Sequence, residues 1–291
     1  MKQSKAVYFF LAPALAAIFI FFFIPVLAAF IISFTDFDIY GLASPDNVRF
    51  IGVTNYIKLF EAPLFWKALG NTFLFVIIAG PLSIAVSLSA ALLLNAKMVK
   101  LKSVFRLSYF IPVVTSLVAV ALVWRYIYHP KFGILNYFLS LLSLDPVDWL
   151  GDASWSMPAI IIMSVWKNFG YNMIIFIAGL QNIPEDLYEA ASIEGATGWQ
   201  KFYKITLPML APTTVFISVI TMIGFFQLFA EPYVMTQGGP LDSTLSIVLY
   251  MYQEGFRWWN MGYSASIAFV LFFIIFVATL LQMRLQKESA S

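Results

Sequence analysis

Long apolar segments without charged residues dominate the hydrophobic pattern of the chain. Five segments run without interruption, and a sixth contains a single charged residue, Lys167. Each segment is close to or longer than the roughly 20 residues that an α-helix needs to cross the hydrocarbon core of a bilayer. We therefore predict an all-α membrane protein that forms one domain over residues 1–291. Its six transmembrane helices are expected at about residues 7–34, 69–95, 107–127, 156–181, 208–231 and 263–284.

The first apolar segment follows Lys2 and Lys5, as the apolar part of a secretory signal would. It is too long for a signal, however, and no small-residue cleavage site closes it before Asp36. We predict a membrane-spanning helix here, bent at Pro25, because the proline ring removes a backbone hydrogen bond.

Lysine and arginine are unevenly distributed among the segments that connect the predicted helices. The two terminal segments and the connections after the second and fourth predicted helices are short. They hold ten of these residues: Lys2, Lys5, Lys97, Lys100, Lys102, Arg106, Lys201, Lys204, Arg284 and Lys287. The connections after the first, third and fifth predicted helices are longer. They hold six: Arg49, Lys58, Lys67, Arg125, Lys131 and Arg257. Cytoplasmic connections carry the excess of basic residues in membrane proteins, so we predict that both termini and the short loops lie in the cytoplasm.

The overall composition agrees with a membrane protein and excludes several kinds of chemistry. Hydrophobic residues make up 61% of the 291 residues and charged residues 11%, whereas water-soluble domains are about half apolar and about a quarter charged. The formal charge of +2 gives no sign of a nucleic-acid partner. The chain has no cysteine and a single histidine, His129, which excludes disulfides, thiol catalysis and metal sites built from these residues. We expect neither a catalytic residue nor a bound metal.

The connection between the fourth and fifth predicted helices, residues 182–208, carries signals that a passive loop does not need. Pro184 suits the first turn of a helix, and Asn182 is a candidate cap before it. Glu185 and Asp186 complement the positive end of the helix dipole. These signals predict a short helix that starts near Pro184.

A second short helix is predicted after Gly195. This glycine is typical of a left-handed helix terminator, and Thr197 with Gln200 forms a T-x-x-Q capping box. Between the two starts, the small side chains of Ala190 and Ala191 let another surface approach closely. A capped helical hairpin of this kind is typical of a docking element.

The same residues carry a resemblance to a known family. The spacing is formed by Glu189, Ala190, Ala191, Gly195, Ile205, Leu207 and Pro208. It matches, without a mismatch, the EAA loop of permease subunits of ABC importers that work with a substrate-binding protein. Residues 182–188, and residues 238–240 with 243–244, are similar to the sugar-importer branch with its maltose, glycerol-phosphate and oligosaccharide permeases. The resemblance covers nearly the whole chain and implies the permease fold of a type I ABC importer.

The resemblance also implies partner chains. An importer of this family uses ATP, and no GxxxxGK[ST] phosphate-binding loop occurs in this sequence. Nucleotide chemistry is therefore expected on a cytoplasmic ABC ATPase dimer that holds ATP and magnesium, and no cofactor is expected on this chain. In the family the EAA hairpin sits in a cleft of the ATPase and moves with it. Glu189, Ala190, Ala191 and Gly195 are the implied contact residues, whereas Leu207 and Pro208 are expected to fix the exit into the fifth helix.

Further implied partners are a second, homologous permease, an extracytoplasmic substrate-binding protein and membrane lipid, but no nucleic acid. The implied location is the cytoplasmic (inner) membrane of a bacterium or an archaeon.

Polar side chains on the fourth and fifth predicted helices are candidates for a substrate path, because polar groups inside a membrane are costly and face the bundle interior. Spacings of four and three residues place members of each set on one helix face. The candidate lining residues are Ser164, Lys167, Asn168, Tyr171, Asn172, Thr221, Phe225, Gln227 and Leu228. Hydroxyl and amide groups beside aromatic faces suit a neutral polyol, and in sugar-handling relatives these two helices contribute to the sugar site. As alternatives, hydroxyls bond to their own helix backbone and asparagines join helices.

Lys167 has two open interpretations, since an ammonium inside the membrane must be paired or must reach water. It either meets an anionic group of a substrate, or it pairs with another residue or an aqueous cavity of the protein.

Two other classes of function compete with an importer permease. An ion-coupled secondary transporter calls for ion ligands at the midplane and usually for internal repeats. Lys167 is the one ionisable midspan residue, and no paired repeat is visible in the sequence. An intramembrane enzyme would need a nucleophile and a base, or metal ligands, gathered inside the membrane.

Overall fold

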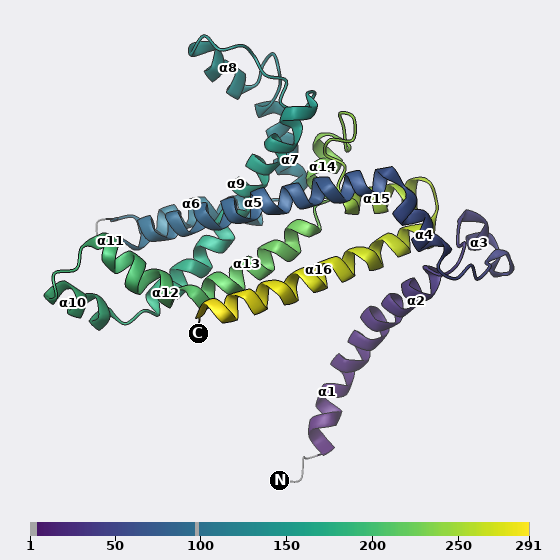
Figure 1. Ribbon diagram of the computed structural model, residues 1–291, viewed down its shortest axis with the longest axis horizontal. Coiled ribbons are helices and arrows are strands. Elements are labelled where there is room, and N and C mark those ends of the chain that lie inside the picture. Colours follow the sequence, from purple (N-terminus) through teal and green to yellow (C-terminus); the bar gives the residue numbers. More distant parts are fainter. Residues whose placement is uncertain (1–4, 97–98, 291) are drawn as a thin grey trace. The chain divides into compact units, whose positions relative to one another are not determined.

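The computed structural model describes residues 5–96 and 99–290, and the regular secondary structure of these residues is helical, with one isolated bridge between Thr35 and Phe50 (Figure 1). The α-helices are α1 (Lys5–Ile18), α2 (Ile24–Ile32), α3 (Ile39–Ala43), α4 (Thr54–Glu61), α5 (Pro63–Asn95), α6 (Lys102–Val114), α7 (Leu117–Ile127), α8 (Ile134–Leu141), α9 (Ala153–Gln181), α10 (Glu185–Ile193), α11 (Gly198–Lys201), α12 (Leu207–Met209), α13 (Ala211–Phe226), α14 (Ala230–Met235), α15 (Ile247–Tyr252) and α16 (Met261–Ala290). Short π-helical turns lie at Phe19–Phe23, Phe202–Thr206 and Gln253–Arg257, and a 3-10 turn lies at Pro45–Asn47.

Four of the described helical stretches are long and apolar enough to cross a membrane as single helices. They are Phe10–Ile32, Pro63–Asn95, Ala153–Gln181 and Met261–Arg284. Two further pairs pass the same test only when taken together, namely Lys102–Val114 with Leu117–Ile127 and Gly198–Met209 with Ala211–Phe226. The described part of the chain therefore has four candidate spans, or six if each bent pair counts as one.

The predicted third span, residues 107–127, differs from the structure. A 99° bend separates α6 from α7, so the segment is not one straight helix. Thr115 and Ser116 adopt extended backbone torsions there, with ψ values of 143° and 129°. The prediction rested on the absence of charge between residues 107 and 124, and that pattern carries no information about backbone direction.

The first helix is irregular close to the predicted position. A π-helical turn at Phe19–Phe23 precedes Pro25, and the backbone N–H of Ile24 donates to the carbonyl of Phe19. Because proline has no N–H and its ring crowds the carbonyl four residues earlier, a widened turn just before it relieves both problems. The helix then continues to Ile32.

The chain divides into two compact units, the first over Met1–Trp66 and Tyr250–Phe273 and the second over Lys67–Leu249 and Ile274–Ser291. In the first unit, the end of α2 is held by contacts from two other segments. The ring of Phe30 packs edge-on against Phe269 with a centroid distance of 5.0 Å, and Tyr56 shares a 2.8 Å hydrogen bond with Ser33. The backbone N–H of Gly262 donates to the carbonyl of Phe37 at 2.9 Å.

In the second unit, α9 is the central helix, because α6, α13 and α14 all pack against it. An apolar cluster surrounds its C-terminal half and joins it to α5 and α13; its buried members are Ala91, Leu94, Met173, Phe176, Ile177, Leu180, Ile183, Leu210 and Ile217. Gly170 allows α6 to approach closely, since a Cβ at this position would overlap the carbonyl oxygen of Tyr109. The position of α9 is therefore fixed on several sides.

Candidate functional site

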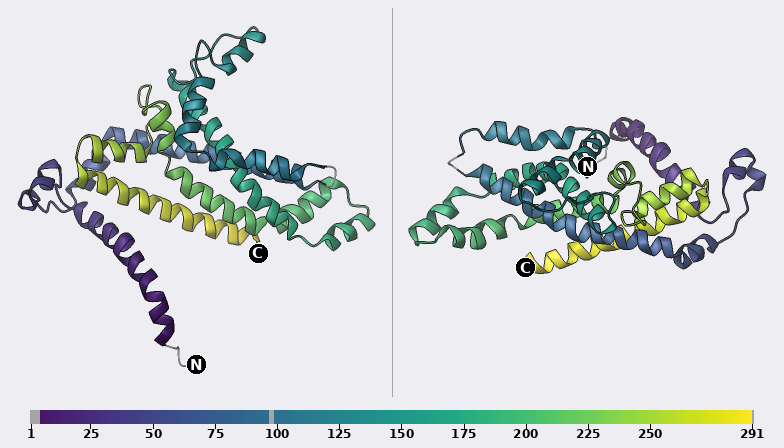
Figure 2. Two further views of the ribbon diagram at one scale, coloured as in Figure 1. Left: turned by 180° about the vertical axis from the view of Figure 1, so that it is seen from behind. Right: turned by 90° about the horizontal axis from the view of Figure 1, so that it is seen from above.

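The connection between α9 and α13 forms the predicted helical hairpin, which we call the docking hairpin (residues 182–208). Figure 1 and Figure 2 show α10 and α11 side by side beyond the end of α9, leading through α12 into α13. The predicted capping box is present: Thr197 Oγ1 accepts from the Gln200 backbone N–H at 3.3 Å, and Gln200 Oε1 accepts from the Thr197 backbone N–H at 2.7 Å. The predicted second helix start is thus confirmed.

Gly195 ends α10 in the left-handed conformation, with φ at +77°. Its N–H donates to the carbonyl of Ser192 at 3.1 Å, and the N–H of Ala196 donates to the carbonyl of Ala191 at 2.9 Å. This pair of hydrogen bonds is the Schellman arrangement, which satisfies the last carbonyls of a helix. The turn between the two short helices is therefore encoded by local chemistry, as predicted.

The capping role predicted for Asn182 is wrong. Asn182 caps the C-terminus of α9, while Pro184 occupies the N-cap position of α10 and makes no side-chain cap. Pro184 has the extended torsion of an N-cap, with ψ at 132°, and directly precedes Glu185, so Asn182 lies two residues too early to be the N-cap of α10. Glu185 and Asp186 lie in the first turn of α10 as expected.

The docking hairpin is tied to the unit that carries it. Two hydrogen bonds hold the hairpin itself together: the hydroxyl groups of Tyr188 and Thr206 share one of 2.9 Å, and Lys201 Nζ donates to Ser192 Oγ at 2.7 Å. Ile205 and Tyr188 also pack against the apolar cluster around α9. A force on the hairpin is therefore transmitted to α9 and α13 through packed side chains, and not only along the chain.

The predicted contact residues lie on the open side of the docking hairpin. Glu189, Ala190 and Gly195 are exposed, and Ala191 is half-buried. Leu207 and Pro208 begin α12, the first half-buried and the second exposed, which agrees with the predicted exit toward the next helix.

Exposed apolar side chains on the hairpin were not predicted from sequence. Ile193 is 89% exposed and Trp199 is 68% exposed, and Leu187 and Tyr203 are also exposed. The sequence does hold a signal for these exposed side chains. Two short helices are too small to bury several large apolar residues, so some of these residues are expected at the surface.

Five of the predicted lining residues meet in one cavity of about 310 Å³, which we call the membrane cavity. Its lining is Asn168, Tyr171, Asn172, Ile220, Thr221, Gly224, Phe225 and Glu231. Asn172 Nδ2 donates to Thr221 Oγ1 at 3.0 Å and so joins α9 to α13, while Asn168 Nδ2 donates to the carbonyl of Ser164 in its own helix at 2.9 Å. Tyr171 is 47% exposed, so the cavity is open on that side.

Four predicted lining residues lie elsewhere. Ser164 is fully buried, and its hydroxyl makes no hydrogen bond within the described part of the chain. Gln227 caps the C-terminus of α13 and is exposed, and Leu228, one residue further, is buried. Because α13 ends at Phe226, the helical spacing that predicts Leu228, with Gln227 beside it, does not extend to these positions.

Lys167 is the fourth of these residues, and it holds the bend between α6 and α7. Its Nζ donates to the carbonyls of Pro112 at 3.0 Å and Val113 at 3.2 Å. These carbonyls belong to the last turn of α6, where no helical N–H reaches them and where the helix dipole favours a cation. Lys167 is only 8% exposed and does not line the membrane cavity.

The prediction missed Ile220, Gly224 and Glu231. Glu231 lies on α14 and interacts electrostatically with Lys167. A separate short helix brings it to the cavity, so no periodicity along α13 could have indicated it. Gly224, three residues after Thr221 on the same face, could have been found from helical spacing.

Comparisons with known proteins agree on one kind of protein. Residues 83–289 match the family described as "Binding-protein-dependent transport system inner membrane component". The chain is 36% identical, over 98% of its length and 89% of the relative, to the arabinooligosaccharides transport system permease protein AraP of Bacillus subtilis (strain 168). It is 35% identical to the lactose transport system permease protein LacF of Rhizobium radiobacter, over 96% of this chain and 93% of that protein.

A solved structure shares the fold. It is a crystal structure of a bacterial alginate ABC transporter in complex with alginate pentasaccharide-bound periplasmic protein, with a TM-score of 0.83 and 22% identity. The match covers 100% of this chain and 96% of that one.

Proposed function

Because the chain belongs to the family of inner membrane components of binding-protein-dependent transport systems, we propose that it is a permease subunit that imports a sugar at the expense of ATP. The observation that carries this proposal is that one helix pair, α9 with α13, holds the docking hairpin and lines the membrane cavity. Motion of the hairpin therefore moves the cavity walls, which is what coupling of ATP hydrolysis to transport requires.

The substrate class we propose is a neutral sugar, polyol or oligosaccharide. Amide groups of Asn168 and Asn172, hydroxyls of Tyr171 and Thr221 and the ring of Phe225 offer hydrogen bonds and an aromatic face in one cavity. Convergent donors and acceptors in a concave wall are how small polar ligands are oriented. Two of the relatives are named for arabinooligosaccharide and lactose transport, which supports the same class.

The ATPase is proposed to be a separate cytoplasmic ABC dimer, because the sequence contains no phosphate-binding loop of the GxxxxGK[ST] type. Glu189, Ala190, Ala191 and Gly195 are proposed to enter its cleft, and the exposed Ile193 and Trp199 supply apolar area for that contact. ATP and magnesium belong to the ATPase, so this chain needs no cofactor.

Two more partners complete the proposed importer. A second, homologous permease would close the open side of the membrane cavity, where Tyr171 is exposed. An extracytoplasmic binding protein would deliver the sugar, as the periplasmic protein is found with the alginate transporter. The excess of lysine and arginine in the short loops supports cytoplasmic termini in a bacterial or archaeal inner membrane.

The testing experiment measures ATP hydrolysis by the reconstituted complex with and without a binding protein and its sugar. Wild type is compared with Glu189→Lys, and Glu61→Lys, which changes an exposed acid of α4, is the matched control. We expect sugar-loaded binding protein to stimulate hydrolysis in wild type and in Glu61→Lys but not in Glu189→Lys. If no ATPase copurifies with the chain, or if Glu189→Lys is stimulated like wild type, the proposed coupling is wrong.

A further inference from the structure

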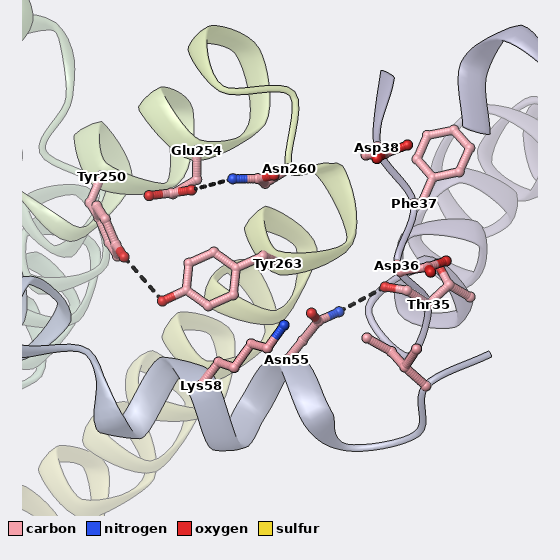
Figure 3. Close-up of a pocket in the computed structure, with 11 residues that line it drawn as sticks. Thr35, Asp36, Phe37, Asp38, Asn55, Lys58, Tyr250, Glu254, Asn260 and Tyr263 are labelled. Carbon is pink, nitrogen blue, oxygen red and sulfur yellow. Dashed lines mark hydrogen bonds between the residues drawn. The ribbon is translucent and has the colours of Figure 1, made fainter. Parts of the chain in front are cut away.

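The first unit contains a polar pocket that uses none of the residues of the membrane cavity (Figure 3). Its volume is about 480 Å³, which lies within the range of pockets that bury a small organic ligand. The lining residues are Thr35, Asp36, Phe37, Asp38, Ile51, Asn55, Lys58, Tyr250, Glu254, Asn260 and Tyr263. We call it the outer pocket, because the charge distribution predicts its loops to lie outside the cytoplasm.

One wall of the outer pocket is fixed by hydrogen bonds before any ligand binds. Asn55 is 5% exposed, and its Nδ2 donates to the carbonyls of Ser33 at 2.9 Å and Thr35 at 2.8 Å. Figure 3 shows the amide nitrogen turned to Thr35 and the carbonyl oxygen turned to the side of Lys58 and Tyr263. That oxygen accepts no hydrogen bond within residues 5–96 and 99–290, so an acceptor without a protein donor faces the pocket.

A second wall is fixed by an ion pair. The backbone N–H of Arg49 donates to Asp36 at 2.6 Å, and its guanidinium donates to the same carboxylate at 2.9 Å. These two contacts hold the pKa of Asp36 below its usual value, so its charge is kept and is balanced by Arg49. The carboxylate of Asp38 is engaged as well, because it accepts from the backbone N–H groups of Tyr40 and Gly41.

The remaining groups offer both donors and acceptors. The side chain of Lys58 makes no ion pair or hydrogen bond with any described residue. One carboxylate oxygen of Glu254 accepts from Asn260 at 3.0 Å, while the other carries no such bond. The hydroxyls of Tyr250 and Tyr263 share a 3.0 Å hydrogen bond, and burial raises the pKa of Tyr250, which keeps its hydroxyl protonated.

This chemistry favours a hydroxyl-rich neutral ligand over an ion. The described residues contain no group of three or more carboxylates or imidazoles that is able to hold a metal ion, although three acids line the pocket. Positive and negative groups are mixed, which disfavours a simple anion. Adjacent hydroxyls of a sugar ring can donate to Glu254 and Asn55 and accept from Lys58, while Phe37 and the two tyrosines present rings.

We propose that the outer pocket binds one sugar residue of a saccharide and so provides a second saccharide site on this chain. The second site presupposes the sugar import proposed above, which places these loops on the face where sugar arrives. It would hold the end of an incoming saccharide with residues that the membrane cavity does not use.

Binding is measured on the full importer complex in nanodiscs, without binding protein, using radiolabelled arabinotriose and lactose as probes. All variants carry Tyr171→Ala and Asn172→Ala, which remove the membrane cavity's own contribution. The test variant adds Lys58→Met and Tyr263→Phe, which leave the hydrogen bonds made by Asn55 and Asp36 in place; Tyr263→Phe also removes the hydrogen bond to Tyr250. The matched control adds Lys67→Met and Tyr40→Phe, an exposed pair outside the pocket.

We expect saturable binding of at least one probe in the cavity-variant background. The test pair should weaken its Kd about tenfold or more, as the loss of a charged and a neutral hydrogen bond implies, and the control pair should change it by less than about twofold. Absence of saturable binding, or equal binding by test and control pairs, would overturn the second site.

One further outcome separates a sugar site from a protein-docking site. If the test pair binds sugar normally but loses stimulation of ATP hydrolysis by the binding protein, the pocket holds a protein side chain and the saccharide assignment is wrong. The two proposals can also fail separately. If sugar and binding protein stimulate ATP hydrolysis but no second class of sugar binding is found, the proposed import function stands and only the proposed sugar site in the outer pocket is wrong.

Discussion

The docking hairpin and the membrane cavity share α9 and α13 but are built in opposite ways. The hairpin is defined by local contacts, such as the Thr197–Gln200 capping box and the left-handed Gly195, and it exposes the residues that we assign to docking. The membrane cavity depends on contacts between segments far apart in the chain, such as the hydrogen bond between Asn172 and Thr221. Recognition by a partner can thus be encoded locally, whereas a translocation site requires the assembled bundle.

The largest expected effect breaks the cavity side of this comparison. Gly170→Val adds a branched side chain where a Cβ already overlaps the carbonyl of Tyr109, so α6 and α9 must separate. We expect the free energy of unfolding to fall by about 3 kcal/mol or more, and little folded complex to be recovered. Gly80→Val is the control, because no atom beyond its chain neighbours and the backbone of its own helix lies within 4 Å of a Cβ added there. Fluorescence-detected size exclusion gives the yields; equal yields for both variants would contradict the close packing.

The next effect concerns Lys167, which closes the bend beside the cavity. Lys167→Met leaves the carbonyls of Pro112 and Val113 without a donor, which should destabilise the chain by about 2–3 kcal/mol. The unfolding temperature of the purified complex should fall, whereas Lys167→Arg, which keeps donors at the end of a long side chain, should recover part of the loss. A methionine variant as stable as wild type would show that the two hydrogen bonds contribute nothing to stability.

A smaller effect tests the link between the two helices. Asn172→Ala and Thr221→Val each remove one partner of the same hydrogen bond, so each should cost about 1 kcal/mol. The double variant should cost little more than either single variant, because the interaction is already lost. Thermal unfolding and the KM for sugar uptake follow both losses. Fully additive values would mean that the two side chains act independently.

The smallest effect tests the hairpin side. Thr197→Ala removes one half of the capping box and should cost about 0.5–1 kcal/mol, confined to the second helix. Hydrogen exchange should quicken at residues 198–201 and stay unchanged at residues 168–172, with sugar binding unaffected. Thr197→Ser, which keeps the hydroxyl, is the control. Faster exchange around the cavity would contradict the local character of the hairpin.

These differences also explain what the sequence was able to predict. The helix starts and stops of residues 182–208 depend on neighbours within a few positions, so most of them were predicted correctly; Asn182 was wrong because Pro184 already supplies the torsion of the cap. Lining residues were predicted from helical spacing, which succeeds inside a helix. It failed at Leu228, and with it at the neighbouring Gln227, because α13 ends at Phe226, a boundary that no strong breaker marks.

The remaining features needed contacts between distant segments. Lys167 Nζ meets the free carbonyls at the end of α6, where a 99° bend separates α6 from α7. The hydropathy pattern of this segment is uninterrupted and so gives no sign of the bend. Glu231 reaches the membrane cavity from a separate short helix. Neither arrangement leaves a periodic signal along its own segment.

The contact between Lys167 and α6 has a consequence for mutational tolerance. Its acceptors are main-chain carbonyls, which every amino acid provides, whereas its donor is a single side chain. Substitutions at Val113 leave the acceptor in place, so these two hydrogen bonds depend on the identity of residue 167 and not on that of residue 113. In a saturation library selected for growth on the transported sugar, codon 167 should therefore tolerate few replacements, and codon 113 many.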